Sequence, residues 1–280
     1  LYLKSKIAHI IESPIEKVDI FIPTVISYKS IDFKVTKICE KAFANAKIQS
    51  LSFASDPCVK VIENSVFYDS TITTLFIPKS LTKLENLWCQ GAKYLNEIEV
   101  DKENRYFSVR DGFLYYKKDG INEILFAPRN FEGDFIVPKD VTRIGDYAFT
   151  QRNGLTSIES APCSKLKMIG SHSFYECENL KSVSFKQNPS LTLGTFCFSK
   201  SNNLKSVTFK EMKEVKLNAQ AFKNCQNLEN VSITNVSDIQ IGKECFCCLN
   251  KLNSIEFISD SINLGDDFVS KCNSLTKVNI

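Results

Sequence analysis

"SFYECENLKSVSF" occupies residues 173–185, and "AFKNCQNLENVSI" occupies residues 221–233. A third version, "CFSKSNNLKSVTF", lies between them at residues 197–209. The three segments begin 24 residues apart and share Phe, Asn, Leu and Val at fixed places. A constant period between 20 and 50 residues is typical of proteins built from stacked repeats. The chain is therefore predicted to be a solenoid.

An aromatic column extends the repeat along most of the chain. Its predicted members are Phe43, Phe67, Trp88, Phe149, Phe174, Phe198, Phe222, Phe246 and Phe268. The one long gap in this series, after Trp88, indicates an insertion. A unit of 24 residues cannot bury its own apolar face, so stacked units are expected to share one core. The column then becomes a ladder of buried rings.

Each unit also contains a pattern typical of a strand with one buried face. Leu180, Val183 and Phe185 recur at equivalent places in the other units, and the last two alternate with polar residues. The chain is thus expected to form short parallel strands, one above the other, with polar side chains on the outward face.

A glycine ends a second short apolar pair in five of the regular units. The glycines are Gly145, Gly170, Gly194, Gly242 and Gly265. Glycine adopts positive φ without steric strain, and Asn218, which replaces it in one unit, tolerates that conformation better than most residues. The column therefore predicts a turn with positive φ.

The combined pattern I-G-x-x-A-F-x-x-C-x-x-L-x-x-V-x-I/F resembles the BspA-type leucine-rich repeat of bacterial and protist surface antigens. "RIGDYAF" at residues 143–149 carries it well, as do the segments quoted above. The resemblance covers residues 18–280. It implies an α/β solenoid that is mostly β: a curved leucine-rich-repeat horseshoe with a parallel sheet of short strands and little helix.

The resemblance also divides the chain, as one repeat domain over residues 1–280. Residues 1–37 resemble the module that precedes the first repeat, residues 38–100 are repeats, and residues 141–280 are regular repeats. Residues 101–140 form an insertion, where "DGFLYYKKDGINEILFAP" predicts two strands around a turn at Lys118, Asp119 and Gly120. This insertion is either a decorated repeat that continues the stack or a protruding element that binds a partner through Tyr115 and Tyr116.

The charge distribution and the hydropathy of the chain argue against a nucleic-acid partner and against a membrane span. The net charge is +3, and the 35 Lys and Arg residues are scattered along the chain rather than concentrated in a basic stripe, so we expect no nucleic-acid partner. No apolar stretch approaches the roughly 20 residues of a membrane-spanning helix, so no membrane span is expected in this segment.

The 11 cysteines are an odd number, which argues against a fully paired disulfide framework. Cys177 and Cys225 lie three residues after the aromatic position, and Cys197 and Cys245 lie one residue before it. Cysteines that recur at repeat positions are expected to be small buried groups and free thiols. "CFCC" at residues 245–248 lacks the second pair of ligands that tetrahedral zinc requires, so no metal site is expected.

No pattern of catalytic residues is found. His172 is one of two histidines, and nothing in the spacing brings Cys163 or Cys177 to it with an orienting group. Glu97 and Glu99 could do acid–base chemistry, but no glycine-rich loop accompanies them. The sequence therefore predicts no enzyme, no catalytic residue and no cofactor.

Binding is left to the outward side chains of the strands, on the expected concave face. The candidate binding residues are Phe76, Glu97, Glu99, Glu159, Ser184, Thr208, Ser232 and Glu256. Their hydroxyls and carboxylates can hydrogen-bond a protein or a glycan, although polar columns also keep any sheet face soluble.

Two functions fit these observations. By resemblance, the chain is a cell-surface or secreted antigen or adhesin that binds host proteins or other cells. The alternative is an intracellular scaffold for protein–protein interaction with the same fold, which the many cysteines favour.

Overall fold

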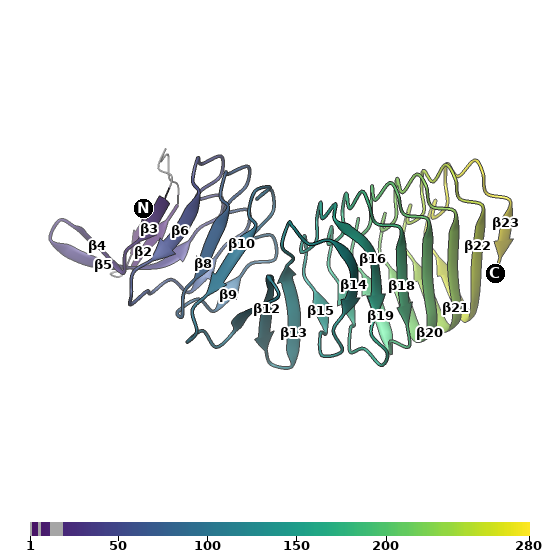
Figure 1. The fold of residues 1–280 in the computed structure, drawn as a ribbon, viewed down its shortest axis with the longest axis horizontal. Helices are drawn as coiled ribbons and strands as arrows, with labels where there is room; N and C mark the ends of the chain where they lie inside the picture. The colour runs from purple at the N-terminus through teal and green to yellow at the C-terminus, as the bar shows by residue number, and fades with distance from the viewer. Residues whose placement is uncertain (1, 5–6, 12–18) are drawn as a thin grey trace. The chain divides into compact units, whose positions relative to one another are not determined.

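The computed structural model describes residues 2–4, 7–11 and 19–280. The chain divides into two compact units, Leu1–Lys118 and Asp119–Ile280, called here the N-terminal unit and the C-terminal unit (Figure 1). In the described residues every regular element is a strand, most of them paired in parallel. The prediction of a mostly β solenoid with stacked parallel strands is confirmed. The described residues hold no helix that would justify the α/β description, and the horseshoe curvature stays a prediction.

The N-terminal unit contains two ladders of strands. The first has the order β1 (Tyr2–Lys4), β2 (Ile7–Ile10), β5 (Ile31–Ile38), β7 (Val61–Ile62) and β9 (Lys83–Leu84), with β4 (Val25–Tyr28) antiparallel to β5. The second has the order β3 (Asp19–Ile22), β6 (Ser50–Phe53), β8 (Thr74–Ile77) and β10 (Glu97–Val100), all parallel. Strands β11 (Phe107–Arg110) and β12 (Phe113–Lys118) form an antiparallel hairpin.

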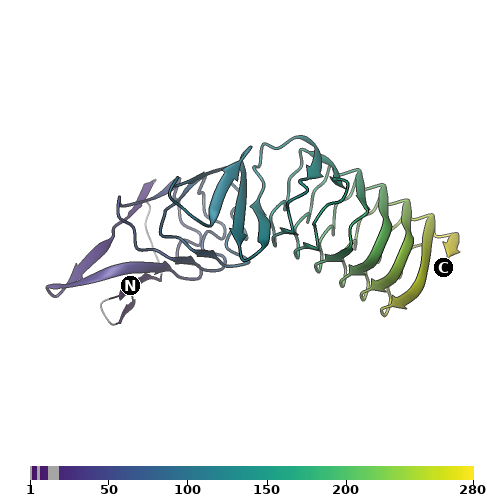
Figure 2. The same cartoon turned by 90° about the horizontal axis from the view of Figure 1, so that it is seen from below.

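The C-terminal unit also has two parallel ladders. The first contains β14 (Gly133–Val137), β16 (Leu155–Ser160), β18 (Ser182–Lys186), β20 (Ser206–Leu217), β21 (Asn230–Ile241), β22 (Ser254–Leu264) and β23 (Lys277–Asn279). The second begins with β13 (Ile121–Phe126), β15 (Arg143–Ile144), β17 (Met168–Ile169) and β19 (Ser190–Leu193), and continues along the later halves of β20, β21 and β22. From β20 onward, the two strands of each coil are therefore one long strand (Figure 2).

Stacked phenylalanine rings form the centre of the C-terminal unit, as predicted. Centroid distances are 4.8 Å from Phe149 to Phe174, 4.9 Å from Phe174 to Phe198, and 5.1 Å from Phe198 to Phe222. The next step, from Phe222 to Phe246, is 5.3 Å. All five side chains are completely buried, so each ring contributes apolar burial together with offset stacking on its neighbours.

The assignment of Phe268 to this ladder is wrong by one residue. Phe222 N donates to Cys245 O, the residue before the next ring. Phe246 N donates in the same way to Phe268 O, which places Val269 and not Phe268 at the ladder position. The cause is a bulge in β21: the register of β21 against β22 changes between Thr234 and Val236, so the next coil, which contains β22, is one residue shorter than the regular coils.

The assignment of Trp88 is displaced as well. Ala92 N donates to Cys89 O, as Cys225 N donates to Phe222 O within its own turn. Cys89 therefore takes the place of the aromatic residue in that turn. Trp88 takes the preceding place and is nevertheless buried, with 1% of its surface exposed. The large ring fills the core from a neighbouring position.

The predicted positive φ of the glycine column is wrong. Positive φ occurs at Gly120 and at three other glycines, none of which belongs to the column. The column glycines are needed for space: a Cβ on Gly194 would lie 2.4 Å from Ser171 N and 2.5 Å from Gly170 C. A Cβ on Gly242 would lie 2.6 Å from Ala219 N. At these glycines the preceding coil approaches so closely that a Cβ would overlap its backbone. Asn218 takes the equivalent place in one coil, where its backbone N makes the matching hydrogen bond to Leu193 O.

Positive φ is instead found two residues before and two residues after each ladder ring. Around Phe222 these are Gln220, with φ of 60°, and Asn224, with φ of 63°. The two left-handed residues turn the chain sharply around the buried ring, and the polar side chains at most of these positions stay at the surface.

The insertion contains the predicted turn. Asp119 and Gly120 have φ of 49° and 79°, as a type I′ turn requires, and they lie between β12 and β13. After this turn, β13 pairs in parallel with β15 and β14 with β16. This second half of the insertion therefore continues the stack of the C-terminal unit.

Candidate binding faces

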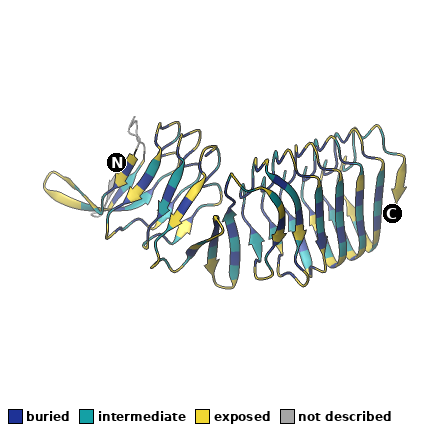
Figure 3. Ribbon diagram, viewed as in Figure 1, coloured by how far each residue is buried: buried dark blue, intermediate teal, exposed yellow. Residues whose placement is uncertain are grey.

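The outward face of the β3–β6–β8–β10 ladder carries three of the predicted residues. Phe76 lies opposite Glu99, and Thr74 lies opposite Glu97, in the pairing of β8 with β10. Both glutamates are exposed and Phe76 is half-buried, while Leu75 between the outward positions is completely buried. The alternation follows from the pleat of the strand and is visible as banding in Figure 3.

Strand β3 adds two residues that the sequence interpretation missed. Phe21 pairs with Ser52 and has 61% of its surface exposed, and Asp19 pairs with Ser50, whose hydroxyl donates to its carboxylate. The outward columns of this unit therefore combine one exposed and one half-buried aromatic ring with carboxylates. The segment "DIFIP", beside "TLFIP" at residues 74–78, was a signal that could have identified β3 as an equivalent strand.

The first ladder of the C-terminal unit brings the other five predicted residues into one row. Glu159, Ser184, Thr208, Ser232 and Glu256 are consecutive partners across β16, β18, β20, β21 and β22. Glu159 is exposed and the other four are half-buried. Ser232 Oγ lies 3.4 Å from Glu256 Oε2, so part of the row is satisfied by hydrogen bonds between neighbouring strands.

Strand β14 begins this row with residues that were also missed. Ile136 pairs with Glu159 and has 61% of its surface exposed. Asp134, in the neighbouring column, accepts hydrogen bonds from Thr156 and Ser157 at 2.6 and 2.7 Å. These two bonds hold the pKa of the Asp134 carboxyl below its usual value, so this carboxylate is charged at neutral pH.

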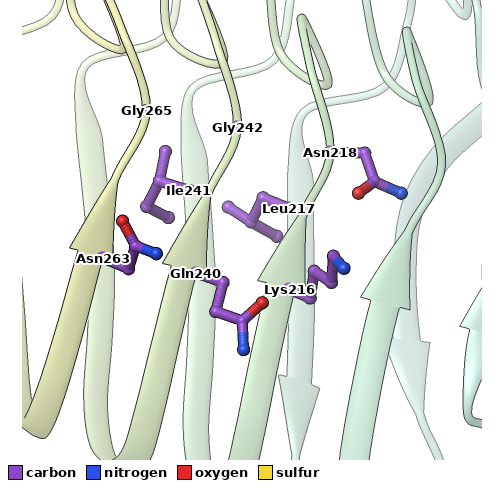
Figure 4. Close-up of a pocket in the computed structure, with 8 residues that line it drawn as sticks. All are labelled: Lys216, Leu217, Asn218, Gln240, Ile241, Gly242, Asn263 and Gly265. Carbon is purple, nitrogen blue, oxygen red and sulfur yellow. The ribbon is translucent and has the colours of Figure 1, made fainter.

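A recess in the second ladder of the C-terminal unit was not predicted at all. It has a volume of about 220 Å³ and is lined by Lys216, Leu217, Asn218, Gln240, Ile241, Gly242, Asn263 and Gly265 (Figure 4). The side-chain amides of Asn218, Gln240 and Asn263 and the ammonium group of Lys216 surround it. Its lining residues come from the ends of β20, β21 and β22 and the positions that follow them, so no pattern within one coil predicts the recess.

The structure does not assemble a cysteine–histidine nucleophile around His172. The imidazole stacks between the rings of Tyr147, at 4.8 Å, and Phe196, at 5.0 Å, and its burial lowers the pKa of the imidazole. The Cys177 thiol donates to Phe149 O at 3.1 Å, and burial raises the pKa of this thiol to about 12. A thiol with so high a pKa is protonated at neutral pH and is a poor nucleophile.

The recurring cysteines have a structural place. Cys177, Cys225 and Cys272, three residues after the ladder position, each donate to a carbonyl oxygen of the preceding coil at 3.0–3.1 Å. All 11 cysteines are free thiols in the structure, and Cys163 is the exposed one. Among the described residues, no three His, Cys, Asp or Glu side chains are grouped so that they could hold a metal ion.

Parallel coils, a shared ladder of buried rings and rows of polar outward side chains define a leucine-rich-repeat solenoid, a class of protein that presents extended surfaces. The sequence matches the family model described as "BspA type Leucine rich repeat region (6 copies)" over residues 19–117, 119–240 and 167–280. The chain belongs to this family of leucine-rich-repeat proteins, and its membership supports a role in protein interaction.

Solved structures of similar fold come from bacteria. A leucine-rich repeat protein from Eubacterium ventriosum aligns with a TM-score of 0.63 at 21% identity, over 89% of this chain and 66% of its own. The pneumococcal vaccine antigen PcpA aligns with a TM-score of 0.53 at 16% identity, over 92% of this chain and 85% of its own. A leucine-rich cell surface protein from Faecalibacterium prausnitzii aligns with a TM-score of 0.50 at 15% identity, over 99% and 92%.

These identities establish a common fold. The chain spans about two thirds of the length of the E. ventriosum protein. Comparison with curated proteins returns no match. In the described part of the chain, no helix is long and apolar enough to cross a membrane.

Proposed function

We propose that the protein is a non-enzymatic antigen or adhesin, located at the cell surface or secreted, that binds a protein or glycan through its outward columns. The proposed contact residues are Phe76, Glu97 and Glu99 in the N-terminal unit and Glu159, Ser184, Thr208, Ser232 and Glu256 in the C-terminal unit. Membership of the repeat family supports an interaction role, and the similar structures include a vaccine antigen and a cell surface protein by their descriptions.

The observation that carries the proposal is the aromatic and acidic face of the N-terminal unit. Phe21 and Phe76 lie outward in the column that ends at Glu99. Neither Glu97 nor Glu99 forms an ion pair with another described residue. A row of polar residues would suffice to keep this face soluble, so the exposed ring of Phe21 and the half-buried ring of Phe76 need another reason. Aromatic residues are enriched at the centres of protein interfaces, with charged groups at the rim.

The rings are tested by a Phe21→Ala/Phe76→Ala variant in binding to immobilised extracts of host cells and extracellular matrix. We expect capture to fall at least tenfold, because a buried aromatic anchor contributes about 2 kcal/mol or more to binding. Tyr94→Ala is the matched control, since Tyr94 is 59% exposed in the same unit but lies outside the columns. Equal capture by both variants would exclude the N-terminal face as the binding site.

The carboxylates are tested separately, with Glu97→Gln/Glu99→Gln/Glu159→Gln at two ionic strengths. Carboxylates at a rim mainly steer association, so this variant should associate more slowly and depend less on salt. The control, Glu103→Gln/Glu132→Gln/Glu178→Gln, removes the same charge from exposed positions outside the columns. If the control slows association as much as the column variant, net charge alone explains the effect, and the columns are not the site.

The alternative function is an intracellular interaction scaffold. The observation that favours it is the set of 11 unpaired thiols, one of them exposed, since such thiols persist in reducing compartments. Labelling intact cells of the source organism with a membrane-impermeant reagent distinguishes the two functions. A surface protein is labelled without lysis, whereas the scaffold is labelled only after lysis.

A further inference from the structure

A second pocket lies in the C-terminal unit, away from the columns described above. It has a volume of about 470 Å³ and is lined by Gly120, Thr142, Cys163, Ser164, Lys165, Lys167, Gln187 and Pro189. These residues come from successive coils, where the chain turns from the first ladder to the second: residues 163–167 join β16 to β17, and residues 187–189 join β18 to β19. The volume is within the range of pockets that bind small ligands.

Two lysines give the pocket its charge. Lys165 and Lys167 flank Leu166, which is completely buried, so both lysines project to the solvent side in this extended segment. Both are exposed, and neither forms an ion pair with any residue in the described part of the chain. Other lysines of the protein do find carboxylates, such as Lys223, which lies 2.6 Å from Glu244. The pocket is therefore lined by two lysines without a carboxylate partner, within one short segment.

A buried hydroxyl adds a third hydrogen-bond donor. Ser164 has 2% of its surface exposed, and its Oγ accepts a hydrogen bond from Leu166 N at 3.1 Å. This bond fixes the oxygen and leaves the hydroxyl proton free to donate, since no acceptor for it is found among the described residues. The uncharged lining residues Gly120 and Pro189 leave room for a larger ligand body.

We propose that this pocket binds an oxyanion: a sulfate, phosphate or carboxylate group, either free or carried on a sugar. The ammonium groups of Lys165 and Lys167 donate charge-assisted hydrogen bonds to its oxygens, and the Ser164 hydroxyl donates another. The site uses none of the residues of the outward columns, so it is independent of the proposed function.

The thiol of Cys163 supplies a direct assay, because it lines the pocket and is the exposed cysteine of the protein. The rate of its alkylation by N-ethylmaleimide, an uncharged reagent, is followed by peptide mass spectrometry. The probes are inorganic sulfate, inorganic phosphate, glucuronic acid, N-acetylglucosamine 6-sulfate and, as an uncharged control, N-acetylglucosamine. We expect at least one anionic probe to slow the alkylation in a saturable way, and the uncharged sugar to have no effect.

A charge variant then identifies the groups that bind. In Lys165→Gln/Lys167→Gln the apparent affinity of the protecting anion should fall about tenfold or more, since hydrogen bonds to charged groups contribute about 1.5–3 kcal/mol. Lys205→Gln/Lys251→Gln removes the same charge from exposed positions outside the pocket and should leave the affinity unchanged. Circular dichroism of each variant verifies that it is folded.

Each outcome decides the proposal. Protection by the inorganic ions alone, or by the sugar acids alone, supports the oxyanion site and identifies the form in which the anion arrives. The proposal is overturned if no anion protects Cys163 up to about 50 mM, well above the Kd of a weak specific site. It is also overturned if N-acetylglucosamine protects equally, or if both lysine variants lose the same affinity.

Discussion

Phe222→Ala is the most direct test of the stacked-coil core. The Phe222 ring is completely buried, with the rings of Phe198 and Phe246 at 5.1 and 5.3 Å on its two sides. Both neighbours are held in their own stacks, so the space left by the ring cannot close. We therefore expect the loss to reach about 3–5 kcal/mol, the range for removing a large buried ring with its cavity left open.

The measurement has to be local, because a repeat array is stabilised mainly by contacts between adjacent coils and need not unfold in one step. Native-state hydrogen exchange of peptides covering residues 221–233 reports the free energy of opening that coil. Phe222→Leu keeps most of the volume and should lose about 1.5 kcal/mol or less, so the two variants test whether the effect follows the size of the cavity.

Phe268→Ala is the matched control, because Phe268 is half-exposed and lies beside the ladder position rather than in it. Its expected loss is below about 1 kcal/mol, since partial burial removes little apolar area. A loss of this small size at Phe222, or equal losses at both positions, would refute the stacked-ring core.

Three further predictions concern a column glycine, the reactivity of two cysteines, and one ion pair of the N-terminal unit. Gly194→Ala should destabilise its coil by about 1–3 kcal/mol, because the Cβ of the new side chain would lie 2.4 Å from Ser171 N in the preceding coil. Thermal denaturation measures this loss, and an unchanged midpoint would contradict the close approach of the two backbones. Under native conditions Cys163 should be alkylated at least tenfold faster than Cys177, whose pKa burial raises to about 12; equal rates in peptide mapping would show that Cys177 is accessible. The hydrogen bond from Lys37 at 2.7 Å holds the pKa of Glu63 below its ordinary value, so the stabilisation that this pair gives the fold is present above the unfolded-state pKa and is lost as the pH falls from about 4.3 through the folded-state pKa. Glu63→Gln should remove this contribution, which is about 1 kcal/mol or less for a partly exposed pair. A series of urea denaturations at falling pH should then show a smaller loss of stability in acid for the variant than for the wild type.

The periodic positions of the fold could be predicted from the sequence because their chemistry is repeated. A completely buried ring at Phe174, Phe198 and Phe222 leaves the same letter every 24 residues, and the strand beside it leaves an alternation. The error at Phe268 arose where the repeat shortens by one residue. The alignment chose Phe268 because it matches the aromatic residue of the other units and lies next to the true ladder position. A valine, Val269, is tolerated at the ladder position because this position is only half-buried.

The glycine column shows a second limit of the sequence. Gly170 and Gly194 are required by the distance between two backbones, and the same letter would appear if positive φ were the reason. Only the spatial neighbours distinguish the two causes. Those neighbours are more than 20 residues away in the chain.

The candidate site was predictable to a similar degree. Glu99 and Ser184 are correctly placed outward because alternation decides which face a strand residue occupies. Phe21 and Ile136 were missed because no member of the predicted aromatic column precedes their strands in the same unit, although "DIFIP" itself matches a repeat strand. The residues that line each of the two pockets come from several successive coils, so no pattern within one coil predicts either pocket.

The bulge between Thr234 and Val236 also bears on how such a chain can diversify. The coil that follows it is one residue shorter, yet Ile233 still faces Phe257 and Ile241 still faces Leu264 on either side. A deletion at the corner between the ladders is thus absorbed locally, whereas the same deletion inside a strand would turn every later side chain to the other face. Inherited length changes should therefore collect at these corners or comprise whole coils. The pocket at residues 163–167 lies at such a corner, where new side chains can be gained without disturbing the ring ladder.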